Sequence, residues 1–206
     1  MMRRIAKTVV AGVLALGLAA CEDTAGPGGE ATMRVSARGD GGPAASRVAG
    51  DGTAFSQALG SAEGTVEFRA RVYVRTEAGS WVELTRRSAE RVTVDASGRG
   101  EAKAFATAGV RATGYDRVRV VFEDVKANVT GGIRIGTGVL SGLVTVDLRS
   151  DGRTVVERGV DVELAAGGSA ELLIDLNADA WLNQASAQSN TVSEAAFESA
   201  VRVTAR

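Results

Sequence analysis

The stretch that decides the fold is TVEFRARVYVRT, residues 65–76. Apolar residues stand at every second position from Val66 to Val74, and charged or polar residues fill the positions between them. Because side chains point alternately to the two sides of a β-strand, this pattern predicts a strand with one buried side and one wet side. Such strands are typical of antiparallel sheets with one face in solvent.

A turn sequence follows this strand directly. Residues 77–80 contain a glycine and lead into Trp81–Leu84, which predicts a hairpin. The alternation assigns Trp81 and Phe122 to the core, whereas Tyr73 on the charged side is expected to be an exposed ring.

The same alternation recurs along the chain between turn residues. It predicts further strands at 32–38, around Val92 and Val94, and at 102–107, 115–123, 125–130, 133–135, 143–148, 154–157, 160–164 and 170–176. Asp151-Gly152 and Gly167-Gly168 predict hairpins. Residues 178–188 predict a short helix. A closing strand through Phe197, Val201 and Val203 is preferred to a helix capped by Thr191 and Glu194.

About ten short strands with glycine turns and little helix predict an all-β fold, a single antiparallel β-sandwich of immunoglobulin-like or transthyretin-like type. The sandwich domain is expected to span residues 31–206. It would contain a long loop at 39–64, where glycine, alanine and serine dominate.

The single cysteine of the chain, Cys21, follows an apolar run. Arg3, Arg4 and Lys7 precede 13 uncharged residues, 8–20, which is the length of a signal-peptide core and less than the ~20 residues that span a bilayer. The run ends in Leu-Ala-Ala-Cys, residues 18–21, which resembles the bacterial lipobox. That resemblance implies a lipoprotein signal peptide at 1–20, acylation of the Cys21 thiol and a flexible tether at 21–30.

Two other roles for Cys21 are open. It could be a buried residue at the end of an ordinary helix, or a catalytic nucleophile. A nucleophilic cysteine generally uses a basic partner, most often histidine, and the chain contains no histidine.

The charge balance bears on partners and location. Without residues 1–20 the chain keeps 21 basic and 25 acidic residues, and it has no basic cluster. This balance argues against nucleic acid as a partner. Glu22 follows the cysteine where aspartate would favour retention in the inner membrane, so the outer membrane is the expected location.

No set of catalytic residues stands out, and no cofactor is expected. Without histidine, Ser-His-Asp catalysis and zinc sites of the usual kind are excluded. Asp175, Asn177 and Asp179 have the oxygen spacing that begins a calcium loop, although Ala180 and Ser186 stand where the loop needs glycine and glutamate. The other interpretation is that these side chains hydrogen-bond the backbone of a turn.

Three segments resemble a bacterial lipoprotein family catalogued as domain of unknown function 4382. They are the strand, turn and tryptophan of residues 66–84, the Gly-Tyr strand start at 114–120, and the strand ending in two aspartates at 172–179, before a closing Val-x-Val. The resemblance covers roughly residues 64–205. It implies an exported β-sandwich on a lipid anchor, and it supplies no activity or site residues.

The sequence therefore predicts a non-catalytic, lipid-anchored envelope module that binds or supports an unknown partner. One alternative is a carrier of a small ligand, which would need a cavity between the sheets. Another is a hydrolase that uses two carboxylates in a cleft.

Overall fold

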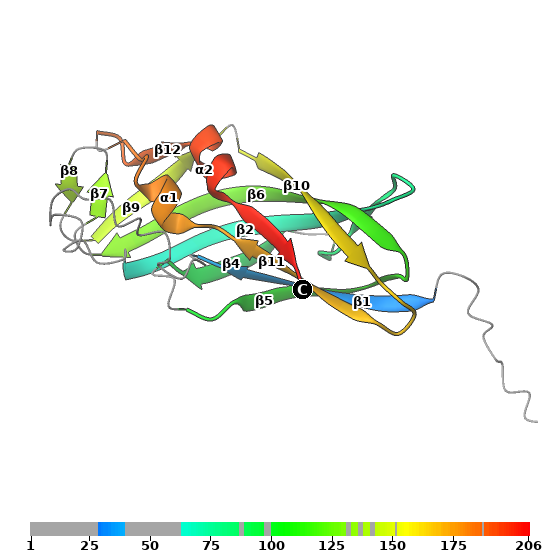
Figure 1. The fold of residues 1–206 in the computed structure, drawn as a ribbon. Helices are drawn as coiled ribbons and strands as arrows, with labels where there is room; N and C mark the ends of the chain where they lie inside the picture. The colour runs from blue at the N-terminus through cyan, green and yellow to red at the C-terminus, as the bar shows by residue number, and fades with distance from the viewer. Residues whose placement is uncertain are drawn as a thin grey trace, which may run out of the picture.

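Two β-sheets packed against each other make up most of the described chain (Figure 1). The computed structural model describes residues 29–39, 63–86, 89–96, 100–130, 133–135, 138–140, 143–150, 152–186 and 188–206. The predicted signal peptide, Cys21 and nearly all of the predicted tether and of the 39–64 loop lie outside these residues. Neither helix of the described chain is long and apolar enough to cross a membrane.

The first sheet, sheet A, has four strands. In order across the sheet they are β13 (Arg202–Ala205), β11 (Ser169–Asp175), β1 (Glu30–Arg38) and β5 (Lys103–Arg111).

The second sheet, sheet B, has seven strands. Its main order is β12 (Thr191–Ser193), β9 (Leu143–Arg149), β6 (Gly114–Thr130), β2 (Glu63–Thr76) and β3 (Trp81–Glu83), with β10 (Thr154–Glu163) also paired to β6 and β4 (Glu90–Asp95) also paired to β2. A separate pair is formed by β7 (Ile133–Ile135) and β8 (Gly138–Leu140), and the helices are α1 (Ala178–Leu182) and α2 (Glu194–Ala200).

The predicted alternation places the core between the sheets. Met33 and Val35 of β1 and Val72 and Val74 of β2 are completely buried, while their neighbours along each strand are mostly wet. The predicted hairpin is also confirmed, because Arg75 of β2 pairs with Trp81 of β3 across the turn. Gly79 lies in this turn with φ of 89°, a conformation that glycine adopts without strain.

The strands predicted at 115–123 and 125–130 are one strand, β6. Asp124 has φ of 53°, and the register to β2 shifts opposite this region, so the strand bends without ending. β10 pairs with residues 114–122 of β6 and β9 pairs with residues 126–130, both antiparallel to β6. The hairpin predicted at Asp151-Gly152 is therefore wrong: β9 and β10 follow one another along the same edge of β6. The strands predicted at 154–157 and 160–164 are likewise one strand, β10.

The hairpin predicted at Gly167-Gly168 is also wrong. This turn carries the chain from β10 in sheet B to β11 in sheet A. The Gly167 N–H donates to the Glu30 carbonyl at 2.8 Å, and the Thr32 N–H donates to the Gly168 carbonyl at 2.9 Å. β11 consequently starts beside the start of β1 and runs parallel to it.

The prediction of a purely antiparallel sandwich is therefore wrong, because the sheets are mixed. Besides β1 and β11, the strands β12 and β9 also pair in parallel. Both parallel pairs join strands that a long stretch of chain separates, so the local sequence carries no signal for their direction.

The closing strand predicted from Phe197 is wrong for its first half, where α2 stands. The Ser193 hydroxyl accepts a hydrogen bond from the Ala196 N–H at 3.3 Å and caps the helix. At the other end, the Arg158 guanidinium donates to the carbonyls of Val201, at 3.1 Å, and of Glu198. α1 is shorter than the helix predicted at 178–188.

The crossing from β5 in sheet A to β6 in sheet B is held by Tyr115. This residue is only 2% exposed, and its hydroxyl donates to the Arg111 carbonyl at 2.8 Å. A hydrogen bond of this kind typically contributes about 0.5–1.5 kcal/mol. It joins the last residue of β5 in sheet A to the start of β6 in sheet B.

We expect Tyr115→Phe to lower the free energy of unfolding by about 0.5–1.5 kcal/mol at neutral pH, as measured by denaturant titration. Burial raises the pKa of the Tyr115 phenol above its ordinary value of 10.0. The phenol's contribution to stability is therefore complete below pH 10.0 and is lost as the pH rises through the folded-state pKa. The variant should lose less stability than the wild type in this alkaline range. Equal stability of the two proteins at neutral pH would show that the hydrogen bond is not needed.

Candidate functional site

The outer face of sheet B carries a group of adjacent arginine and aromatic side chains. The strand registers place side chains of β2, β3 and β6 in adjacent positions on this face. We name the following set the arginine face: Arg69, Arg71, Tyr73, Arg75, Trp81, Arg117 and Arg119.

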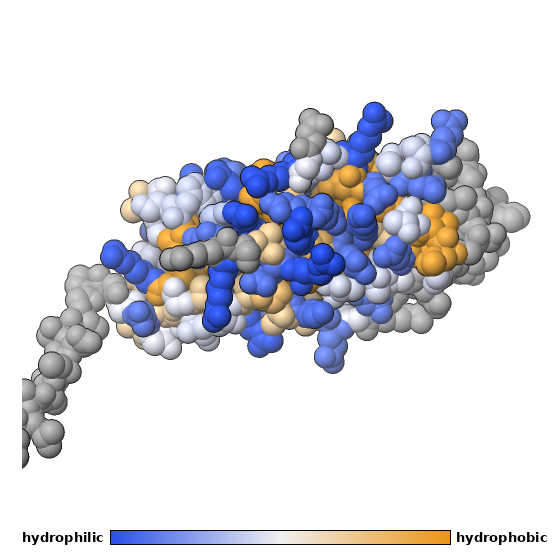
Figure 2. Space-filling view, turned by 180° about the vertical axis from the view of Figure 1, so that it is seen from behind, coloured by the Kyte–Doolittle hydropathy of each residue, from blue (hydrophilic) through white to orange (hydrophobic). Residues whose placement is uncertain are grey.

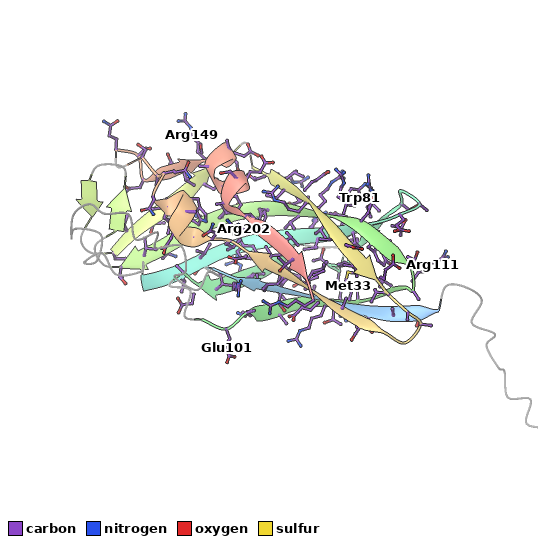
Figure 3. All side chains as sticks on the ribbon, viewed as in Figure 1. Met33, Trp81, Glu101, Arg111, Arg149 and Arg202 are labelled. Atoms are coloured by element: carbon purple, nitrogen blue, oxygen red, sulfur yellow. The ribbon has the colours of Figure 1, made fainter. Side chains whose placement is uncertain are left out.

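Trp81 lies on this face and not in the core, so its predicted position is wrong. In β3 and the residue after it, Val82 and Leu84 point to the core, and Trp81 therefore points outward. The Arg119 guanidinium lies 4.2 Å from the centre of the Trp81 ring, and that of Arg75 lies 6.0 Å from it. Figure 3 shows Trp81 toward the end of the molecule where the β2–β3 hairpin projects.

The tryptophan in the core is Trp181 of α1, which is completely buried. Its ring meets that of Phe197 at a centroid distance of 5.6 Å. The alternation of Val82 and Leu84 is the sequence signal from which the outward position of Trp81 could have been predicted.

Ion pairs fix several guanidinium groups of the arginine face. Arg119 Nε lies 2.6 Å from Glu157 Oε1, and Arg117 lies 3.9 Å from the other oxygen of the same carboxylate. Arg75 Nε donates to Asp116 Oδ1 at 3.0 Å. This hydrogen bond lowers the pKa of Asp116 below its ordinary value and raises that of Arg75. The paired arginines are thereby held in place beside the Trp81 ring.

The three residues of the predicted calcium motif lie at the end of β11 and the start of α1. Asp175 Oδ2 accepts from Arg38 Nη2 at 3.0 Å, and Asp175 Oδ1 accepts from the Asn177 N–H at 3.0 Å. Asn177 itself has φ of 47°. This is the hydrogen bonding of a turn, and a cation at Asp175 would have to compete with Arg38.

Open hollows lie on the outer faces of the two sheets. One of about 690 Å³ crosses sheet A beside Arg34, Thr107 and Glu171, and one of about 280 Å³ lies on sheet B beside Arg69 and Arg91. Within the described ranges, no three His, Cys, Asp or Glu side chains lie close enough to hold a metal ion. Figure 2 shows the molecule from behind. Its middle is largely hydrophilic, and apolar patches lie among the hydrophilic side chains.

Comparison with known proteins gives no relative: no family model, no curated protein and no solved structure matches the chain. The resemblance to domain of unknown function 4382 accordingly stays a prediction.

We expect the melting temperature to be the same in millimolar calcium and in chelator. An ion that binds the folded state at a hundredfold excess over its Kd would add about 2.7 kcal/mol, or about 5–10 °C for a domain of this size. A rise of that size, abolished by Asp175→Asn together with Asp179→Asn, would establish the calcium site and contradict the turn interpretation.

Proposed function

We propose that the protein is a non-catalytic, lipid-anchored module of the bacterial cell envelope that binds a partner through the arginine face. The observation that carries the proposal is the gathering of five arginines, Tyr73 and Trp81 on one wet sheet face. Arginine and aromatic residues are the types most enriched at the energetic centres of protein interfaces. Four of its arginines are held by ion pairs before binding, so less side-chain entropy is lost when a partner docks.

The anchor is the lipobox-like sequence that ends at Cys21. β1 begins at Glu30, so the chain from Cys21 can extend at most about 30 Å before it enters sheet A. The module would thus act close to the membrane surface, with the outer membrane preferred because Glu22 replaces aspartate. Membership in the family of unknown function 4382 is part of the same proposal.

The packing between the sheets favours this function over a small-ligand carrier. Phe68 and Phe122 of sheet B and Met33 and Leu172 of sheet A are at most 1% exposed. The hollows beside Arg34 and Arg69 open outward and do not lie between the sheets. The hollow beside Arg69 is lined by two carboxylates, Glu67 and Asp124, but Asp124 is ion-paired with Arg69. This pairing does not favour the carboxylate hydrolase.

We expect Cys21→Ser to abolish lipidation, because serine has no thiol to carry the diacylglyceryl group. Labelled palmitate should enter the wild-type protein in its own bacterium and not the variant. Equal labelling of the two proteins would disprove the lipid anchor.

A photo-crosslinking residue placed at Tyr73 in the full-length protein should give a defined adduct in intact cells. The matched control carries the same residue at Thr204, which is exposed on β13 of the other sheet. Adduct formation at both positions, or at neither, would contradict a partner-binding role for the arginine face.

A further inference from the structure

Arg71 differs from every other cation that the structure describes. Among the described residues, it is the one half-buried arginine or lysine whose side chain has neither a hydrogen bond nor an ion pair. Its Nε atom is completely buried and has no partner. Arg38, Arg75, Arg119 and Arg158, which are buried to a similar degree, all bind carboxylates or carbonyls.

Two more arginines stand beside Arg71. Arg69 is two residues away on the same side of β2, and its Nε is also buried without a partner, although its Nη2 pairs with Asp124. Arg91 of β4 lies directly opposite Arg69 in the strand register and has no ion pair with a residue that the structure describes. Like charges in this position repel each other. A ligand anion on the solvent-exposed sides of these guanidinium groups would reduce the repulsion between Arg69 and Arg91 and give Arg71 a partner.

The surface beside Arg71 is apolar on the side of β6 and β10. Val121 of β6 lies directly opposite Arg71, and Val155 of β10 lies directly opposite Val121. Val155 is 44% exposed, which makes it one of two large exposed apolar residues among those described. Toward the start of β2, the hollow of about 280 Å³ is lined by Arg69, Arg91 and Lys126, together with Glu67 and Asp124. The charged hollow and the apolar surface of Val121 and Val155 thus both adjoin the region around Arg71 and Arg69.

We propose that Arg71, Arg69 and Arg91 bind an oxyanion, a carboxylate or phosphate, that is carried next to an apolar group. Guanidinium groups recognise such anions with paired N–H donors, and partial burial strengthens the contact. The apolar part of the ligand lies on Val121 and Val155. This inference rests on the proposed binding role of the arginine face and names the chemistry that the face recognises.

The test uses the full-length protein in nanodiscs of uncharged phospholipid, with acetate, hexanoate and inorganic phosphate as probes at constant ionic strength. Two-dimensional NMR of the arginine Nε–Hε groups follows each residue separately. The Arg71 signal should shift saturably with each probe, and hexanoate should bind at least about tenfold more tightly than acetate because its added methylenes are buried.

Variants separate this site from general attraction to a charged surface. Arg71→Gln should abolish saturable binding, and Arg91→Gln should weaken it while the Arg71 signal remains observable. The matched control Arg202→Gln, an exposed arginine on β13, should bind as the wild type does. Melting curves check that each variant is folded.

Three results would overturn the inference: no saturable shift of Arg71, unchanged binding in Arg71→Gln, or equal affinity for acetate and hexanoate. Because the titration needs no protein partner, these results can be told apart from failure of the crosslinking experiment. Saturable binding without any adduct at Tyr73 would leave the anion site in place and reject the partner.

Discussion

The rest of the structure depends on β6, a strand of 17 residues that is paired along both edges except around Asp124. β2 covers one edge, while β10 and then β9 cover the other. Because side chains alternate, this strand contributes Val118, Val120 and Phe122 to the core and Arg117 and Arg119 to the outer face. The bend at Asp124 divides the strand between its two neighbours on that second edge.

Inside the sandwich, contacts between aromatic rings connect β6 to β2 and to the two helices. Phe122 meets Phe68 of β2 at 5.5 Å and Phe197 of α2 at 5.1 Å between ring centres, and Phe197 in turn meets Trp181. Such edge-to-face contacts add to the burial of large apolar surfaces. The core therefore holds sheet B and both helices together, and the outer face is free to carry charged groups that contribute little to packing.

The sequence predicted what depends on neighbours along the chain and missed what depends on distant partners. Alternation in residues 65–76 and the turn around Gly79 are local signals, so β2 and its hairpin with β3 were predicted. Asp151-Gly152 resembles a hairpin turn, yet β9 before it and β10 after it both pair with β6 and not with each other. The turn at Asp175 and Asn177 was recognised, whereas the arginine face needed the register between β2, β3 and β6 and could not be read from any single segment.

Hydrogen exchange of the β6 amides tests most directly that one continuous strand organises both the core and the arginine face. A strand paired on both edges should exchange slowly over residues 115–122 and again over 126–129, with both segments opening at one common free energy. Faster exchange is expected only around Asp124. Two segments that open at clearly different free energies would show two independent hairpins and contradict this account.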